Sequence, residues 1–267
     1  RSTDSTHLLP NAMNVCSQDL DQIEVLSVGN ADRVVPCRDR IAATDVFLRR
    51  VHEPSCGEID SIRQQFLLHR SLSQSGVVDA HDLILSDGVV SGFTMPAMDG
   101  NTLAESGGEL QPRELLAVLR DAAMATFSLH CLGYLHGDLT ANNVWITGEG
   151  TGTEGLLLDL GFATRIGARL TTEIRGTLGH ISPEASLGRP LRPAADAYSF
   201  GNMLDHCLAF LTDQRTRERL ASLVRRCTQE TEELRLSDFA VIYSALMRIA
   251  RECVAPRFPH SRHLLPL

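Results

Sequence analysis

Short runs of β-branched and aromatic residues alternate with polar stretches over the first part of the chain. Three such runs predict strands, and they lie at 24–29, 32–37 and 44–51. Residues 58–72 then place apolar side chains near helical spacing, which predicts a helix. Two more strand-like runs follow, at 81–86 and 89–95. Asp87-Gly88 joins them, and this dipeptide is typical of tight hairpin turns.

Helical periodicity dominates the rest of the chain. Amphipathic patterns predict four helices, at 111–132, 196–211, 215–228 and 237–253. Before them, residues 96–108 are rich in turn-forming residues and mark a candidate lobe boundary. The pattern therefore predicts an α+β protein in which a small β-rich lobe precedes a larger helical lobe.

The chain has 267 residues, of which 43% are hydrophobic and 22% are charged. These proportions support an ordinary globular core and exclude a mostly disordered or collagen-like chain. No apolar run approaches the roughly 20 residues that a membrane helix needs, so we expect no transmembrane segment. The net charge is −8 and no basic block stands out, so nucleic acid is not an expected partner. All 25 basic residues are arginine, which leaves the chain without lysine chemistry.

The seven cysteines are spread through the chain without a CxxC pair, which argues against a zinc site. Disulfides in a secreted protein would give this distribution, and so would buried free thiols in a cytosolic protein. We favour the secreted alternative, with at least one cysteine unpaired within the chain. Residues 1–10 lack the apolar core of a signal peptide.

Two segments place acidic and amide side chains beside apolar stretches. They are 136–143, HGDLTANN, and 156–162, LLLDLGF. Phosphoryl transfer needs oxygen ligands that hold Mg²⁺ against ATP phosphates, and a carboxylate that orients the attacking hydroxyl. Asp138 is the candidate base, with Asn143 and Asp159 as candidate metal ligands. The alternative is an ordinary loop in which these residue types form turns.

Both segments resemble signatures of the protein kinase family. HGDLTANN is similar to the catalytic loop HRDLKxxN, and DLG is similar to the metal motif DFG. Downstream, 176–184 resembles the end of the activation segment, and 196–201 resembles the start of the helix that anchors the large lobe. The resemblance implies a protein-kinase-like bilobal fold. Its parts would be an N-terminal arm at 1–20, a reduced β-rich N-lobe at 21–97 and a helical C-lobe at 98–267.

The resemblance also assigns structural roles. Arg235 stands where the family's arginine pairs with a glutamate, here Glu184. In this fold Cys207 and Cys227 would fall on neighbouring helices, so a disulfide between them is a candidate. The other positions matched by motif are His136, Leu160, Gly161 and Asp196.

Four departures from the family pattern concern nucleotide binding and activation. The glycine-rich loop is missing, because Gly29 is the only glycine before Gly57. Arg49 takes the position of the β-strand lysine, and a guanidinium is not an equivalent phosphate anchor. Gln65 takes the position of the glutamate that would pair with that lysine. Gly137 replaces the arginine of HRD, which removes activation through that arginine.

From these departures we expect a pseudokinase that is not an enzyme, with weak or no ATP binding and no cofactor. The base position Asp138 and the metal positions Asn143 and Asp159 would then be vestigial. Such a chain would act as a scaffold or regulatory binding protein for protein partners of unknown identity.

A narrower resemblance is to the secreted rhoptry-type kinases of apicomplexan parasites. Within them, the best match is the group without a glycine loop, which includes active kinases and a bradyzoite pseudokinase. The shortened small lobe, the scattered cysteines and HGDL in place of HRDL carry this resemblance. It implies secretion into the parasitophorous vacuole or the cyst wall.

Two alternatives stay open. In the first, the chain is an active, atypical Ser/Thr protein kinase without a glycine loop. It would use ATP with magnesium, and Arg49 or Arg50 would substitute for the lysine. In the second, it is a small-molecule kinase of the aminoglycoside or choline type, whose usual motif is HGDLxxxN. The matches at 176–184 and 196–201 argue against the second, because those families lack this activation segment.

Overall fold

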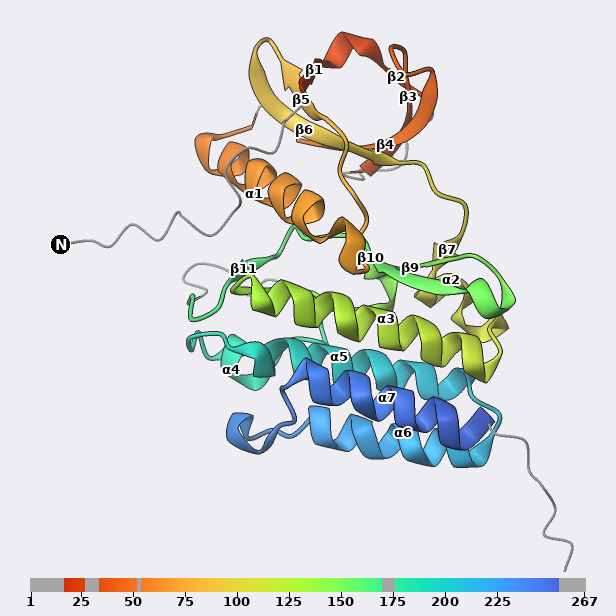
Figure 1. Ribbon diagram of the computed structural model, residues 1–267. Coiled ribbons are helices and arrows are strands. Elements are labelled where there is room, and N and C mark those ends of the chain that lie inside the picture. Colours follow the sequence, from red (N-terminus) through yellow and green to blue (C-terminus); the bar gives the residue numbers. More distant parts are fainter. Residues whose placement is uncertain (1–16, 27–33, 52–53, 170–175, 255–267) are drawn as a thin grey trace, which may run out of the picture.

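A computed structural model of the chain describes residues 17–26, 34–51, 54–169 and 176–254. The chain forms a small lobe built on a curled β-sheet and a larger lobe of packed helices (Figure 1). One long helix lies beneath the sheet, on the side that faces the helical lobe. The predicted α+β, bilobal fold is therefore confirmed.

The small lobe is a six-stranded sheet in the order β1-β5-β6-β4-β3-β2. Its strands are β1 Ser17–Asp19, β2 Ile23–Val25, β3 Val34–Asp39, β4 Thr44–Arg50, β5 Leu83–Ser86 and β6 Val89–Pro96. β1 pairs with β5 in parallel, and the other neighbours are antiparallel. Asp87 and Gly88 both have positive φ, 51° and 76°. This conformation matches a type I′ hairpin turn, as the dipeptide predicts.

Helix α1, Cys56–Leu72, crosses beneath this sheet (Figure 1). It begins at a capping box, in which Ser55 and Glu58 satisfy each other's backbone amides. Ile62 and Phe66 on its inner face are buried in one apolar cluster with Phe93 of β6. Because the helix is fixed to the sheet by this cluster, its remaining inner side chains face the space between the lobes.

The helical lobe holds six α-helices among the described residues. They are α2 Leu103–Ser106, α3 Pro112–Cys131, α4 Pro183–Ser186, α5 Pro193–Cys207, α6 Gln214–Cys227 and α7 Phe239–Val254. Short strands lie along the edge that faces the small lobe: β7 Asn101–Thr102, β8 Tyr134–Leu135, β9 Val144–Thr147, β10 Glu154–Leu157 and β11 Thr164–Arg165. β9 pairs with β7 and β10, and β8 pairs with β11.

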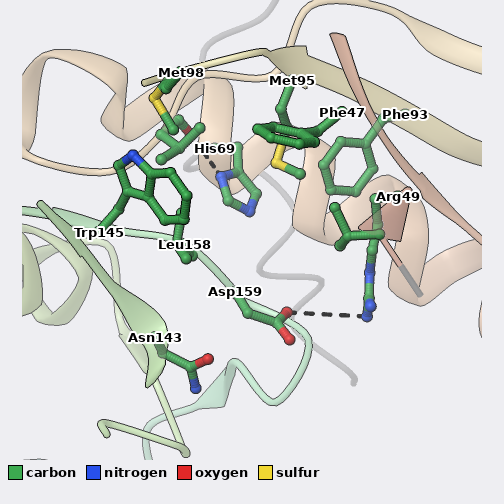
Figure 2. Close-up of a pocket in the computed structure, with 12 residues that line it drawn as sticks. Phe47, Arg49, His69, Phe93, Met95, Met98, Asn143, Trp145, Leu158 and Asp159 are labelled. Carbon is green, nitrogen blue, oxygen red and sulfur yellow. Dashed lines mark hydrogen bonds and ion pairs between the residues drawn. The ribbon is translucent and has the colours of Figure 1, made fainter. Parts of the chain in front are cut away.

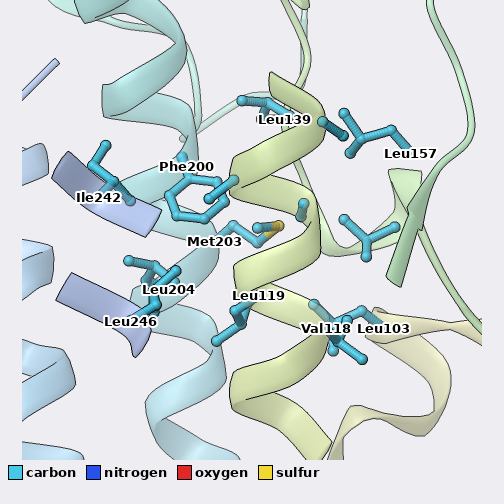
Figure 3. Packing of buried hydrophobic residues seen from close by; sticks show 14 of the residues in the cluster. Leu103, Val118, Leu119, Leu139, Leu157, Phe200, Met203, Leu204, Ile242 and Leu246 are labelled. Atoms are coloured by element: carbon cyan, nitrogen blue, oxygen red, sulfur yellow. The ribbon is translucent and has the colours of Figure 1, made fainter. Parts of the chain in front are cut away.

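A continuous apolar core holds α3, α5 and α7 together (Figure 3). Leu119 of α3 packs among Phe200 and Met203 of α5 and Ile242 and Leu246 of α7, and all five are 0% exposed. Complete burial of a large apolar side chain contributes about 1.5–3 kcal/mol. The same cluster extends to the loops between β8 and β10, so the core supports the segments that carry the predicted catalytic residues.

The long elements agree with the predicted ranges, since each buries one face and therefore shows a clear period in sequence. The short elements β7 to β11, α2 and α4 were not predicted, because two to four residues hold too little of any period. Part of the predicted strand at 24–29, most of the predicted arm at 1–20 and the glycine-loop position around Gly29 lie outside the described residues.

The cysteines contradict one prediction. The five described cysteines are free thiols: Cys37, Cys56, Cys131, Cys207 and Cys227. Cys207 and Cys227 lie on the packed helices α5 and α6, and burial raises the pKa of each to about 12. A neutral, buried thiol packs as a small apolar side chain. The predicted disulfide between these two residues is therefore wrong.

Candidate active site

A cavity of about 330 Å³ lies between the two lobes (Figure 2). Its walls are mostly apolar and come from both lobes: Val34, Phe47, His69, Val78, Phe93, Met95, Met98, Trp145 and Leu158. Arg49, Asn143 and Asp159 form its polar end. Small-molecule sites commonly combine apolar walls with a few convergent polar groups, so this cavity is the candidate active site.

Asp196, the fourth residue of α5, holds the loop that carries the predicted base. Its carboxylate accepts hydrogen bonds from the backbone amides of His136, at 2.8 Å, and Gly137, at 2.9 Å. It also pairs with Nε2 of His130 at 2.8 Å. Burial alone would raise the pKa of Asp196, but the His130 contacts and these amides hold it below the ordinary value. The charged carboxylate thus fixes the start of the loop to the helical core.

Gly137 makes a tight approach possible at this position. Its φ is +83°, in the left-handed region that favours glycine. A Cβ atom there would lie 2.6 Å from the carbonyl oxygen of Phe162. Glycine at position 137, where the HRD pattern has arginine, therefore fits the space beside Phe162. A larger side chain would force this loop away from 159–162.

His136 is fully buried beside Asp138. Its Nδ1 accepts the Asp138 amide at 3.3 Å, so Nε2 carries the ring proton. That Nε2 has no hydrogen-bond partner among the described residues. Burial lowers the pKa of His136, which keeps the ring neutral. A neutral ring at this position orients the backbone of the predicted base without adding charge to the site.

Asp138 and Asn143 are joined directly, as the shared segment predicts. The Asn143 side-chain amide donates to the Asp138 carbonyl oxygen at 2.8 Å and to its carboxylate Oδ2 at 3.1 Å. The other carboxylate oxygen, Oδ1, accepts the backbone amide of Thr177 at 2.8 Å. Each carboxylate oxygen has a second lone pair, so Asp138 can still accept a hydroxyl proton.

Asp159 faces Arg49 across the polar end of the cavity. The carboxylate Oδ1 accepts the Gly161 amide at 2.7 Å and lies 3.9 Å from Arg49 Nη2. A Cβ on Gly161 would lie 2.8 Å from this Oδ1 and 2.9 Å from Nη2. Glycine at 161 therefore permits the approach of the two charges. The buried guanidinium at the lysine position is thus directed at the predicted metal ligand (Figure 2).

Gln65 lies buried on α1, and its side-chain amide donates to Ser61 Oγ at 3.1 Å. Its Oε1 is buried without a hydrogen-bond partner among the described residues.

Leu160, between Asp159 and Gly161, is 1% exposed and belongs to the core of the helical lobe. The DLG segment is therefore anchored by an apolar side chain on one side and opens to the cavity on the other.

His69 is a lining residue that the motif comparison missed. It lies on α1, is 1% exposed, and its Nδ1 lies 2.7 Å from the carbonyl oxygen of Val78. A carbonyl only accepts, so Nδ1 carries the proton and Nε2 is an acceptor. Burial lowers the pKa of His69 to about 4. The helical period from Phe66 could have indicated that it is buried, but not that it faces a cavity.

Glu184 and Arg235 form a buried, bidentate ion pair, and neither residue lines the cavity. Arg235 donates to the two carboxylate oxygens at 2.6 and 3.2 Å. It also donates to the carbonyl oxygens of Ala194 and Gln229. Burial would raise the pKa of Glu184, but the hydrogen bonds and charge of Arg235 hold it below its usual value. The pair ties α4 to the loop before α7.

The donor set at the polar end fits a magnesium nucleotide. Asn143 commits its amide nitrogen to Asp138, which leaves its Oδ1 for a ligand, and Asp159 contributes a carboxylate. Mg²⁺ prefers oxygen ligands and usually keeps waters and substrate phosphates beside one or two protein carboxylates. Among the described residues no group of three or more His, Cys, Asp or Glu side chains could hold a metal alone. The apolar walls suit a flat heterocycle.

A two-lobed fold with an apolar cavity between the lobes, two oxygen ligands at its polar end and a carboxylate bonded to one of them is typical of phosphotransferases of the kinase type. The protein kinase domain matches residues 21–254 of the chain. The chain therefore belongs to the protein kinase domain family.

Its relatives include Ser/Thr protein kinases from bacteria and animals. It is 33% identical over 144 residues to serine/threonine-protein kinase PkaB of Streptomyces coelicolor, covering 51% of this chain and 33% of that protein. It is 28% identical over 190 residues to serine/threonine-protein kinase 36 of Pongo abelii, covering 68% and 14%. It is 29% identical over 117 residues to serine/threonine-protein kinase pkn2 of Myxococcus xanthus, covering 41% and 14%. The chain thus spans a third or less of the length of these relatives.

These matches correct one prediction. The prediction that the chain is not an enzyme is wrong, because the chain belongs to the protein kinase domain family and the named relatives are Ser/Thr protein kinases. It was drawn from the missing glycine-rich loop and from Arg49, Gln65 and Gly137. Of these residues Arg49 lines the cavity, and the loop that carries Asp138 is assembled in the structure. None of the helices in the described part of the chain combines the length and apolar character that a bilayer crossing requires.

Proposed function

We propose that the chain is an atypical Ser/Thr protein kinase that transfers the γ-phosphoryl group of magnesium ATP to a protein hydroxyl. One observation carries the proposal. Asn143 and Asp159, from two separate segments, meet at the polar end of one apolar cavity, and the side chain of Asn143 is bonded directly to Asp138. Similarity to several Ser/Thr protein kinases supports the choice of substrate class.

In this proposal Asp138 is the base. Two donors, Thr177 and Asn143, hold its carboxylate in one orientation. It accepts the proton of the attacking serine or threonine hydroxyl, and the hydroxyl oxygen forms a bond to the γ-phosphorus as the bond to the β-phosphate oxygen breaks. Orientation of this kind is the main contribution that a protein makes to phosphoryl transfer.

Asn143 and Asp159 would hold Mg²⁺, which neutralises charge on the nucleotide phosphates when bound. Arg49 then takes part in phosphate binding from the opposite wall. Its side chain is 7% exposed, and its Nη2 lies 3.9 Å from the Asp159 carboxylate. A guanidinium offers a planar fork of donors that fits two phosphate oxygens, and it keeps its charge at any working pH. The site would therefore bind phosphates through an arginine where the family pattern has a lysine.

The test is transfer of ³²P from labelled magnesium ATP to a generic Ser/Thr substrate such as casein, with phosphoamino-acid analysis of the product. The matched pair of variants is Asp159→Asn and Asp60→Asn. Asp60 is an exposed carboxylate on α1, so its loss should leave the rate unchanged. Asp159→Asn should lower the rate at least a hundredfold.

Phosphate on serine or threonine that depends on Asp159 supports the proposal. Wild-type transfer equal to that of Asp159→Asn would overturn it, as would transfer to a small-molecule alcohol with none to protein. Thermal unfolding of both variants checks that each is folded under the assay conditions.

The narrower resemblance to secreted rhoptry-type kinases stays a prediction. The relatives described above are bacterial and animal kinases. The secreted location was favoured by the expectation of disulfides, and the five described cysteines are free thiols. Secretion into a vacuole or cyst wall therefore depends on that resemblance alone, and detection of the chain in a secreted fraction would test it.

A further inference from the structure

A second hollow of about 380 Å³ lies on the helical lobe and shares no lining residue with the cavity between the lobes. It runs between α3 and α7, beside the loop at 150–153. Its floor is apolar and comes from Leu116 and Ala117 of α3 and from Leu246, Met247 and Ala250 of α7. We call this hollow the α3–α7 groove.

Arginines surround the floor of the groove. Arg113 and Arg120 reach it from α3, and Arg251 reaches it from the last turn of α7. Arg120 is already paired with Asp121 at 2.6 Å. Arg113 and Arg251 are exposed, and neither forms an ion pair with a described residue. Two guanidinium groups without an ion pair among the described residues therefore flank the apolar strip from α3 and α7, at the end where α3 begins and α7 ends (Figure 1).

The one acidic residue in this lining offsets only part of that charge. Glu114 stays negative while its Oε2 accepts the Gln111 amide at 2.8 Å, and three arginines line the same groove. The whole chain carries a net charge of −8, so a positive groove is a local exception to an acidic molecule. A positive patch on an acidic molecule attracts a negatively charged partner to that patch, and the acidic remainder of the surface repels the same partner.

We propose that the α3–α7 groove docks an acidic peptide segment that carries large aliphatic side chains. The apolar floor provides contact area for the aliphatic side chains of such a peptide. A nucleic-acid backbone or a lipid headgroup has no aliphatic side chains to place there. The arginines provide carboxylate recognition, since their planar donors pair with both carboxylate oxygens. The groove thus acts as an interaction site that is separate from phosphoryl transfer.

Fluorescence polarisation tests the proposal with a labelled peptide of glutamate and leucine, in which the leucines lie on one helical face. A second peptide replaces each leucine by serine at the same net charge. The wild-type chain should bind the first peptide saturably and the second at least tenfold more weakly. Arg113→Glu/Arg251→Glu should weaken binding of the first peptide roughly tenfold or more, which equals about 1.4 kcal/mol.

The matched control is Arg215→Glu/Arg225→Glu on α6. Arg215 and Arg113 are each the second residue of a helix, and Arg225 and Arg251 each lie in a last turn. All four are exposed, so helix-dipole effects and net charge change equally. The control should retain wild-type affinity. A third variant, Ala117→Phe, fills the floor without changing charge and should also weaken binding.

Equal loss in the groove and control variants would overturn the proposal, because it would mean general electrostatic attraction. Equal binding of the leucine and serine peptides would overturn it too. If sedimentation shows that the groove mediates a dimer of this chain, the occupant is a second copy and the proposal is wrong. Thermal unfolding confirms that the variants are folded, and kinase activity toward casein should be the same in all of them.

Discussion

The two lobes meet at one cavity, but they hold their contributions to it in different ways. On the helical side, Asp138 and the loop around it are fixed by Asp196 through two backbone amides and by Asn143. On the sheet side, Arg49 reaches Asp159 at 3.9 Å, and Gln65 supplies no charge. The candidate catalytic loop is therefore held by several hydrogen bonds, whereas the described part of the small lobe brings Arg49 to the site, where the proposed function would use it for phosphate binding.

This difference indicates that the residues of a kinase-type site do not all tolerate substitution equally. The catalytic loop lies on a buried network in which each charge has several partners, so a change there removes the network. The lysine position lies on a strand whose neighbours are apolar, and another cation can occupy it. The prediction that the chain is not an enzyme was drawn mainly from departures in the small lobe, and it gave too much weight to that side of the cavity.

The largest expected effect is on the helical side. Asp138→Asn keeps an acceptor oxygen for the Thr177 amide but removes the base. Loss of a general base lowers a rate by about 10²–10⁴-fold. The initial rate of ³²P transfer at saturating magnesium ATP measures this, and nucleotide affinity by calorimetry should change little. Asp205→Asn, an exposed carboxylate on α5, is the control. An unchanged rate in Asp138→Asn would refute its role as base.

The next effect concerns the framework of the helical lobe. Arg235→Met leaves the carboxylate of Glu184 buried without its partner. Breaking one side of a buried ion pair costs about 3–5 kcal/mol of unfolding free energy. Urea unfolding followed by circular dichroism measures it. The double variant Glu184→Gln/Arg235→Met should recover part of the loss, and a single-variant loss below about 1 kcal/mol would contradict the structural role.

A pH effect of intermediate size belongs to the small lobe. The pKa of His69 is lowered to about 4 in the folded chain, from an ordinary value of 6.5. Between these values the unfolded chain binds a proton that the folded chain does not, so stability falls as pH drops from 6.5 towards 4. The full difference is roughly 3 kcal/mol.

Urea unfolding at a series of pH values tests this dependence. His69→Gln keeps a donor for the Val78 carbonyl and should flatten the stability profile in that window. His136, whose pKa is also lowered, retains its own contribution in the variant. An equally steep profile in His69→Gln would show that His69 is not the source.

The smallest expected effect concerns the arginine that the small lobe brings to the site. Arg49→Met removes the single cation that the strand contributes near Asp159, and we expect roughly tenfold weaker binding of magnesium ATP. Calorimetric titration measures the affinity, with the exposed Arg38→Met on β3 as control. The transfer rate at saturating nucleotide should fall much less than in Asp138→Asn. A loss as large as in Asp138→Asn would mean that both lobes are equally indispensable.

The candidate base and metal ligands could be selected from the sequence because they lie in two contiguous motifs, and their catalytic roles stay predictions. Asp138 and Asn143 are five residues apart and bond to each other. The walls of the cavity could not be predicted in this way. Phe47, His69 and Trp145 come from β4, α1 and β9, and their convergence depends on how those elements pack.

The approach of Arg49 to Asp159 is a second feature that the motifs did not predict. This approach depends on the absence of a Cβ atom at Gly161. A family motif states that glycine occurs at this position but does not give the geometric reason for it. The predicted disulfide between Cys207 and Cys227 was also wrong, because the packing of two helices does not determine whether the thiols that they carry form a disulfide.

Arg49 has a practical consequence for detecting this protein. Reagents built on acyl phosphates of nucleotides mark a binding site by acylating a nearby amine, and a guanidinium that stays protonated does not react in this way. The chain has no lysine at any position. If the proposed nucleotide binding holds, a chemical survey that relies on amine labelling would therefore leave the cavity of this chain unmarked even when nucleotide occupies it.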